Sequence, residues 1–247
     1  MMLVVVMAMG CGDGDKVAVD APIPDAPPDA FGMLDCAGQP LPTTAPDPLT
    51  LSGTTYEITS LGAKPLAAVM LSVFVIDETT ARETTTSDAQ GNFSMSGPTG
   101  GVANFGYVEA AATDHTTSYS FGATAAYMNV TNSQVAIVTT GAIGQLAEFA
   151  GVTQTPGNAV IQVEAIDCAG TPLPGATFTT TPAGTIVYQK NGLPLGTASM
   201  TDTAGVGYVF DVPPGMVTIA AQVGTLTLRS HVVIAFADAP TFTAIQP

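Results

Sequence analysis

The sequence contains no tryptophan and very few basic side chains. Its 247 residues include five Lys and Arg against 20 Asp and Glu, so the formal net charge is −15 at pH 7. Proteins that bind nucleic acid rely on Lys and Arg to neutralise phosphate groups. We therefore expect no nucleic-acid partner, and no electrostatic attraction to acidic lipid headgroups.

Helical periodicity is almost absent as well. Beyond the first 48 residues, short runs rich in Thr, Val, Ile, Tyr and Phe are bounded by Gly, Pro, Asn and Asp. This pattern is typical of an all-β sandwich. Residues 71–77, 159–167 and 206–212 alternate well enough to be strands with one buried face.

One interior helix is expected over residues 140–150, where apolar residues recur at intervals of three and four. Thr139 or Thr140 is the expected N-cap, and Gly151 suits the left-handed position at the C-terminal end. Because this helix lies between two β-rich segments, we interpret it as a packing spacer.

The N-terminus has an apolar run, residues 1–9, that is far shorter than the ~20 residues of a membrane-spanning helix. The sequence Ala-Met-Gly-Cys that ends at Cys11 resembles a bacterial lipobox, in which the Cys is lipidated and becomes the mature N-terminus. The resemblance implies a lipoprotein signal peptide over residues 1–10 and a membrane anchor at Cys11. The alternative is a free N-terminal Cys beside a frayed apolar tail.

Residues 11–48 repeat Asp-Ala with prolines between the copies. Such a stretch cannot bury apolar surface, and proline with self-repelling carboxylates favours an extended chain. We predict a disordered stalk that could hold a folded body on the order of 100 Å from a membrane.

The remaining chain contains an internal repeat. Residues 64–69, Lys-Pro-Leu-Ala-Ala-Val, match residues 171–176, Thr-Pro-Leu-Pro-Gly-Ala, and residues 86–93 match residues 200–208. Repeated segments of this kind indicate two units of the same fold. We predict one unit over residues 49–138, a helix and linker over 139–157, and a second unit over 158–247.

The second unit resembles the carboxypeptidase regulatory-like domain, and the first is a degenerate copy. The resemblance is carried by Pro-Leu-x-Gly-Ala, then Thr-Asp-x-x-Gly-x-Tyr, then Asp-Val-Pro-Pro-Gly. It implies two tandem transthyretin-like (prealbumin-like) β-sandwiches with no peptidase activity. With lipobox and stalk, the arrangement is similar to surface lipoproteins of myxobacteria. It implies a location in the cell envelope, on the outer membrane with the body in the periplasm or at the cell surface.

The residues of this motif have structural explanations. Asp in such a turn accepts backbone N–H bonds, the following Gly supplies positive φ, and the aromatic at Phe93 or Tyr208 enters the core. We assign turn-forming roles to the following residues: Asp88, Gly91, Asp202, Gly205, Pro213, Pro214 and Gly215.

Cys36 and Cys168 lie in nearly identical contexts, Asp-Cys-Ala-Gly-x-Pro-Leu-Pro. In an oxidising compartment they could form a disulfide that ties the end of the stalk to the second unit. The alternative is two unpaired thiols left by duplication. Neither His115 nor His231 is near a Cys in sequence, so we expect no zinc site.

Catalytic motifs are missing from the sequence: it has no G-x-S-x-G, H-E-x-x-H or phosphate-binding G-x-x-x-x-G-K. We expect no catalytic residue, cofactor or metal. A triad of His115 with Ser118 or Ser120 would need geometric support, and Arg229 and His231 are interpreted as exposed polar positions of one strand.

Three functions stay open. The favoured one is a non-catalytic, lipid-anchored envelope protein that acts as a spacer or adhesive module toward an envelope protein. The second is glycan binding, for which the candidate contacts are Tyr107, Tyr119, Tyr127 and Tyr188. The third is a secreted hydrolase of an unrecognised type. The oligomeric state does not follow from the sequence.

Overall fold

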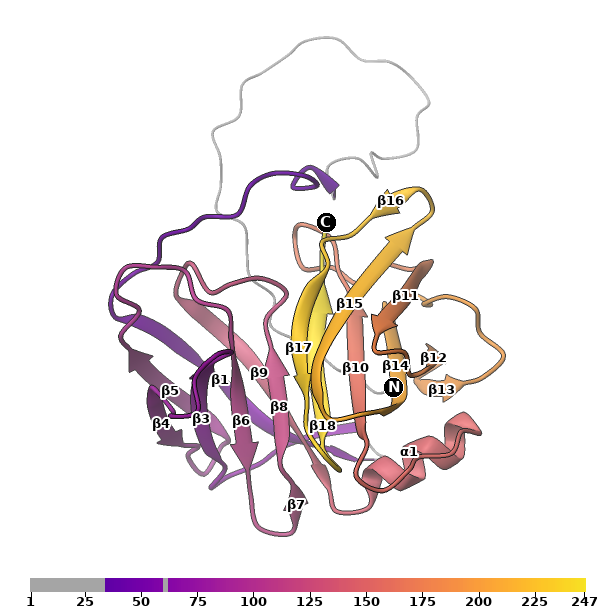
Figure 1. Ribbon diagram of the computed structural model, residues 1–247. Coiled ribbons are helices and arrows are strands. Elements are labelled where there is room, and N and C mark those ends of the chain that lie inside the picture. The colour runs from indigo at the N-terminus through magenta and orange to yellow at the C-terminus, as the bar shows by residue number, and fades with distance from the viewer. Residues whose placement is uncertain (1–33, 60–61) are drawn as a thin grey trace.

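The computed structural model describes residues 34–59 and 62–247 (Figure 1). The predicted signal peptide, the predicted lipidation site Cys11 and residues 12–33 of the predicted stalk lie outside the described residues. The described part is mostly β-strand with one short helix, which confirms the predicted all-β sandwich class.

The strands of the first half run from β1 to β9: β1 (Leu49–Thr59), β2 (Gly62–Pro65), β3 (Met70–Val75), β4 (Glu83–Thr86), β5 (Asn92–Gly97), β6 (Gly106–Ala111), β7 (His115–Thr116), β8 (Ser118–Phe121) and β9 (Val130–Thr139). The helix α1 (Ala142–Ala150) follows. The second half contains β10 (Ala159–Ala165), β11 (Ala176–Thr181), β12 (Thr185–Lys190), β13 (Leu193–Leu195), β14 (Val206–Val212), β15 (Gly215–Val223), β16 (Leu226–Thr227), β17 (His231–Ala235) and β18 (Pro240–Ile245).

The two halves repeat one strand connectivity. In the first half, β1 runs parallel to β9 and antiparallel to β5, while β3, β6 and β8 form a second antiparallel set. In the second half, β10 runs parallel to β18 and antiparallel to β14, while β11, β15 and β17 form the second set. The sequence repeat therefore corresponds to a repeat of topology.

The halves also share a sheet. Strands β18 and β8 pair in parallel through Thr241 with Tyr119 and Phe242 with Ser120, and this pairing creates a nine-stranded sheet in the order β13-β12-β14-β10-β18-β8-β6-β3-β4. Figure 1 shows the magenta strands of the first half beside the yellow strands of the second. The expectation of two sandwiches in tandem did not include this common sheet, and the division into two domains stays a prediction.

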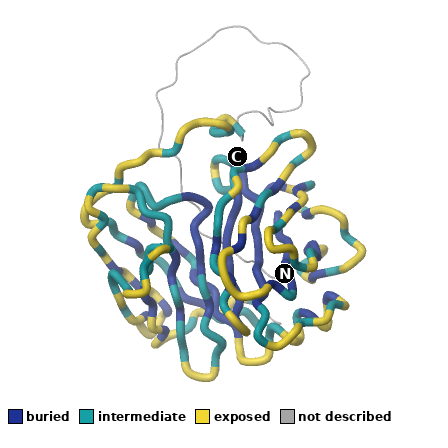
Figure 2. Tube along the Cα trace, in the orientation of Figure 1, coloured by how far each residue is buried: buried dark blue, intermediate teal, exposed yellow. Residues whose placement is uncertain are grey.

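Two smaller sheets and α1 cover the nine-stranded sheet. Residues of β3 and β6 pack against β1, β5 and β9 of the five-stranded sheet. Residues of β10 and β14 pack on one side against β11, β15 and β17, and on the other side against α1. Figure 2 shows that the buried residues follow the strands, whereas the exposed ones gather in the peripheral loops.

Helix α1 ends as the sequence predicts and begins differently. Gly151 adopts a left-handed conformation with φ of 68°, and its N–H donates to the carbonyls of Ala147 and Glu148. The N-cap is Gly141, also left-handed, and no side chain caps this end. The expectation that Thr139 or Thr140 caps the helix was wrong, because the hydroxyl of Thr140 donates to the carbonyl of Asp114 instead.

The last part of the predicted stalk is attached to the folded body. Residues 34–47, here called the strap, cross the edge where both halves end (Figure 1). Near its end, the strap forms backbone hydrogen bonds with the first half: the N–H of Ala103 donates to Thr43 over 2.9 Å, and the N–H of Ala45 donates to Gly101 over 3.1 Å. The disordered stalk predicted to residue 48 therefore does not extend through the strap.

Candidate functional site

The strap and the second half are joined by a disulfide between Cys36 and Cys168, whose Cα atoms lie 5.7 Å apart. Beside it, the Arg229 guanidinium donates to the carbonyl of Gln39 over 2.8 Å, and Leu34 packs against the core of the second half. The strap thus touches the second half at one end and the first half at the other. It connects the halves a second time, independently of the shared sheet.

The repeated turns are built alike in both halves. Asp88 Oδ1 accepts the backbone N–H groups of Gln90 and Asn92, and its pKa is lowered by these bonds, the one from Asn92 foremost. Asp202 Oδ1 accepts the N–H of Ala204 in the same way. These aspartates satisfy backbone donors of a turn, which is a structural task.

The glycines of these turns are confined by a neighbouring strand. Gly91 and Gly205 have φ of 81° and 69°, and a Cβ at these positions would lie 2.7 Å from the Thr55 carbonyl and 2.5 Å from the Ala165 carbonyl. The Gly91 carbonyl accepts the N–H of Thr55, and the Gly205 carbonyl accepts the N–H of Ala165. Only a residue without a side chain fits such a turn.

A buried hydroxyl next to each turn was not identified from the sequence. The Ser87 hydroxyl donates to the Leu66 carbonyl and accepts the N–H of Val69. The equivalent Thr201 hydroxyl donates to Leu173 and accepts the N–H of Ala176. The signal was available, because Ser87 and Thr201 precede the matched aspartates in the repeat.

The aromatic that follows the turn differs between the halves. Phe93 lies in the core between the two sheets of the first half, as expected. Tyr208 is buried, but on the face that packs against α1. In the repeat, the neighbouring Gly207 is the residue that corresponds to Phe93. The Phe178 ring fills the place of a side chain at Gly207, because a Cβ on Gly207 would lie 2.7 Å from that ring.

The Pro213-Pro214-Gly215 segment carries the chain from one sheet to another. Strand β14 belongs to the nine-stranded sheet and β15 to the four-stranded sheet. Gly215 has φ of 130°, and Pro213 and Pro214 are exposed. The three residues therefore form a sharp crossing at the rim of the sandwich.

The four candidate tyrosines do not form an exposed platform. Tyr107 is 9% exposed, stacks on Phe74 and Phe121, and has its pKa raised by burial. Tyr119 stacks on Phe236 with ring centroids 3.5 Å apart, and burial, assisted by the Glu109 charge, raises its pKa to about 12. These rings contribute to the core beside the junction of the halves.

The other two tyrosines are also poor contacts for a sugar. Tyr188 is 7% exposed, and its hydroxyl accepts the N–H of Phe178 over 2.9 Å. Tyr127 is half-buried. Sugar binding usually needs open aromatic faces, so these positions do not favour the glycan hypothesis.

The imagined Ser-His-Asp triad is not assembled around His115. The His115 Nδ1 atom lies 2.6 Å from the carbonyl of Thr113, and its Nε2 atom lies 3.7 Å from a carboxylate oxygen of Glu57. The Ser118 hydroxyl donates to the carbonyl of Thr116. The serine and the imidazole are thus engaged with other groups.

His231 and Arg229 are not the exposed pair that the sequence suggested. His231 lies against the ring of Phe105, its Nε2 atom is 2.9 Å from the Thr243 hydroxyl, and burial lowers its pKa to about 4. Arg229 is half-buried and holds the strap. The two residues do not share a strand either, because Arg229 lies between β16 and β17 and His231 begins β17.

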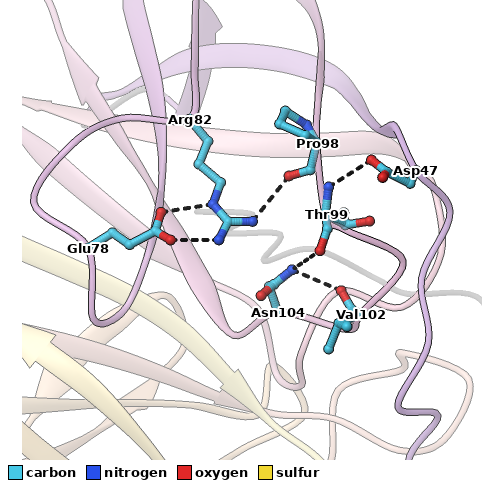
Figure 3. A network of polar contacts seen from close by, with 7 residues as sticks. All are labelled: Asp47, Glu78, Arg82, Pro98, Thr99, Val102 and Asn104. Carbon is cyan, nitrogen blue, oxygen red and sulfur yellow. Dashed lines mark hydrogen bonds and ion pairs between the residues drawn. The ribbon is translucent and has the colours of Figure 1, made fainter.

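A polar network closes one end of the first half (Figure 3). The Arg82 guanidinium donates two hydrogen bonds to Glu78, which lowers the pKa of Glu78, and a third to the Pro98 carbonyl. The N–H of Thr99 donates to the Asp47 carboxylate. The network borders an apolar cavity of about 110 Å³ between the two sheets and holds the strap and two loops together.

Within residues 34–59 and 62–247, no group of three or more His, Cys, Asp or Glu side chains could hold a metal ion. None of the helices in this part of the chain is long and apolar enough to cross a membrane.

Comparisons with known proteins give no family. No protein-family model matches the chain, and no curated protein matches it. Among solved structures, it is similar to the shaft pilin SpaA of Lactobacillus rhamnosus GG, with a TM-score of 0.27 and 14% identity over 81% of this chain and 98% of the pilin.

Two other solved structures show similarity of the same order. The minor pilin GBS52 of Streptococcus agalactiae gives a TM-score of 0.23 and 12% identity over 80% of this chain and 95% of that chain. A cohesin–X-dockerin complex chain of Acetivibrio cellulolyticus gives 0.25 and 16% over 44% of this chain and 76% of that chain. TM-scores this low carry no argument, and the fold assignment rests on the sheets themselves.

Proposed function

We propose that the protein is a non-catalytic, lipid-anchored envelope protein whose folded body acts as a spacer or adhesive module. The observation that carries the proposal is the double connection between the halves, through the β8–β18 pairing and through the disulfide-bonded strap. A body joined in this way resists separation of its halves when it is pulled by the N-terminal segment.

In this proposal, Cys11 is acylated after removal of residues 1–10, and residues 12–33 connect the lipid to the strap. The two halves are related transthyretin-like units of the carboxypeptidase regulatory-like type, and their partner is an envelope protein. The repeat of connectivity in the halves and the turn-forming aspartates support a duplicated scaffold. The outer membrane is the proposed location.

Expression of the full chain in a bacterium with lipoprotein processing tests the anchor. We expect the chain in the membrane fraction, a mature N-terminus at Cys11 with an added lipid mass, and sensitivity of its processing to globomycin. The Cys11→Ser variant should become soluble, whereas Cys168→Ser, the matched control, should stay in the membrane. An unmodified Cys11 in the mature protein would refute the anchor.

A further inference from the structure

A groove of about 420 Å³ lies where the two halves meet, on the face of the nine-stranded sheet that carries α1. Its floor consists of side chains from β10, β14 and β18, namely Val160, Gln162, Tyr208 and Phe242. Helix α1, the ends of β1 and β9, and the β12–β13 hairpin surround it. The volume falls within the ~300–1,000 Å³ of small-molecule sites.

Gln162 lies on β10, the middle strand of the floor. It pairs in register with Tyr208 on one side and Phe242 on the other, so its amide lies between two aromatic residues. Gln162 is 3% exposed, and its Nε2 donor has no hydrogen-bond partner among the described residues. The neighbouring Tyr208 hydroxyl is directed to Gln189 over 3.3 Å. Buried donors are rarely left unpaired, because an unmade hydrogen bond destabilises the fold.

The groove is uncharged. Among the described residues that line it there is no Asp, Glu, Lys, Arg or His, and burial raises the pKa of Tyr208 so that its hydroxyl stays neutral. A charged ligand group would therefore lose its hydration without gaining a counter-charge. At the rim, Phe149 on α1 is 63% exposed and Leu193 on β13 is 46% exposed. These two side chains offer apolar surface to a chain that leaves the floor.

We propose that this groove binds a neutral amphiphile, a linear apolar chain that ends in an uncharged carbonyl group. The carbonyl oxygen accepts the hydrogen bond of Gln162 Nε2, and the apolar chain lies against Phe149 and Leu193. The site is formed by both halves together, since its walls come from β1 and β9 of the first half and its floor from β10, β14 and β18 of the second.

The probe for the test is decanamide, with decanoate as the charged analogue of the same chain length. The full chain carries Cys11→Ser, so that no lipid competes, and binding is followed by NMR of ¹⁵N-labelled protein. We expect decanamide to bind saturably and to shift the side-chain NH₂ resonances of Gln162. Decanoate should bind at least about tenfold more weakly, because its charge is not compensated in the groove.

Two variants and a control assign the effect. Gln162→Leu keeps the size of the side chain and should weaken decanamide binding about tenfold, because the ligand carbonyl loses its donor. Gln222→Leu, at an exposed position of β15, is the matched control and should leave binding unchanged. Phe149→Ala removes an exposed rim side chain, should leave folding intact, and should weaken binding of both probes.

The proposal is overturned by any of three results. These are the absence of decanamide binding to the wild-type groove, binding that leaves the Gln162 side-chain resonances in place, and equal affinity of Gln162→Leu and wild type. If Gln162→Leu does not fold, the wild-type resonances and Phe149→Ala still decide the question.

Discussion

Removal of the Cys36–Cys168 disulfide should destabilise the folded body substantially. The bridge closes a loop between residues 132 positions apart. In the chain-entropy description, a cross-link over a loop of this length lowers the entropy of the unfolded chain enough to contribute about 5 kcal/mol, while measured bridges typically contribute 2–4 kcal/mol. For Cys36→Ser/Cys168→Ser we therefore expect the free energy of unfolding to fall by about 2–5 kcal/mol.

Urea unfolding followed by far-UV circular dichroism measures this difference, because the chain has no tryptophan for fluorescence. Wild type and variant both carry Cys11→Ser, so that Cys11 cannot form another bridge. Reduction of the wild-type protein should reproduce the loss, and the reductant should not affect the variant. A loss below about 1 kcal/mol would refute the reasoning, because the bridge would then not constrain the unfolded chain.

Three further predictions concern the repeated turns and the buried histidine. Thr201→Val removes the hydroxyl that donates to the Leu173 carbonyl and accepts the N–H of Ala176, so the free energy of unfolding, measured with urea or heat, should fall by about 1–3 kcal/mol. The control Thr203→Val, at an exposed position, should change it by less than about 0.5 kcal/mol. Equal effects of the two variants would contradict the role of the Thr201 hydroxyl. Gly205→Ala places a Cβ 2.5 Å from the Ala165 carbonyl at φ of 69° and should lower the free energy of unfolding by at least about 2 kcal/mol. The control Gly224→Ala, at φ of 59° with open space around it, should lower it by only about 1 kcal/mol. Similar losses in the two variants would argue against the close contact between Gly205 and the Ala165 carbonyl. Burial lowers the pKa of His231 from 6.5 to about 4, so the unfolded chain takes up the proton at a higher pH than the folded protein does. The free energy of unfolding should therefore fall by about 3 kcal/mol as the pH drops from 6.5 to 4, and urea unfolding at several pH values measures this change. His231→Gln should remove that part of the pH dependence, and identical pH profiles would show that His231 is accessible.

The strands and the repeat could be predicted because their signals are local. Alternation of apolar residues marks the buried strand faces, and the matched Asp and Gly residues sit in turns whose geometry depends on neighbouring backbone. Gly151 was identified as the helix end for the same reason, since a left-handed residue favours glycine. The N-cap was not, because Thr140 finds a distant partner in Asp114.

The shared sheet could not be predicted from the sequence. The β8–β18 junction involves only two residue pairs from strands far apart in the chain, and no local pattern specifies such a partner. Tyr107 and His231 are buried by contacts between the halves around this junction, and Gln162 is buried on the face of the sheet that carries α1. The tyrosines therefore resembled candidate contacts in the sequence, whereas the groove around Gln162 gave no sequence signal.

The pairing of β8 with β18 joins the halves in one sheet. Hydrogen exchange followed by mass spectrometry, on peptides that cover residues 118–121 and 240–245 of the full chain, tests it most directly. We expect the backbone amides of both strands to exchange slowly, as interior strands of a sheet do. Fast exchange of those amides in β8 and β18 that are not bonded to β6 or β10 would show that the halves are separate, and would contradict the shared sheet.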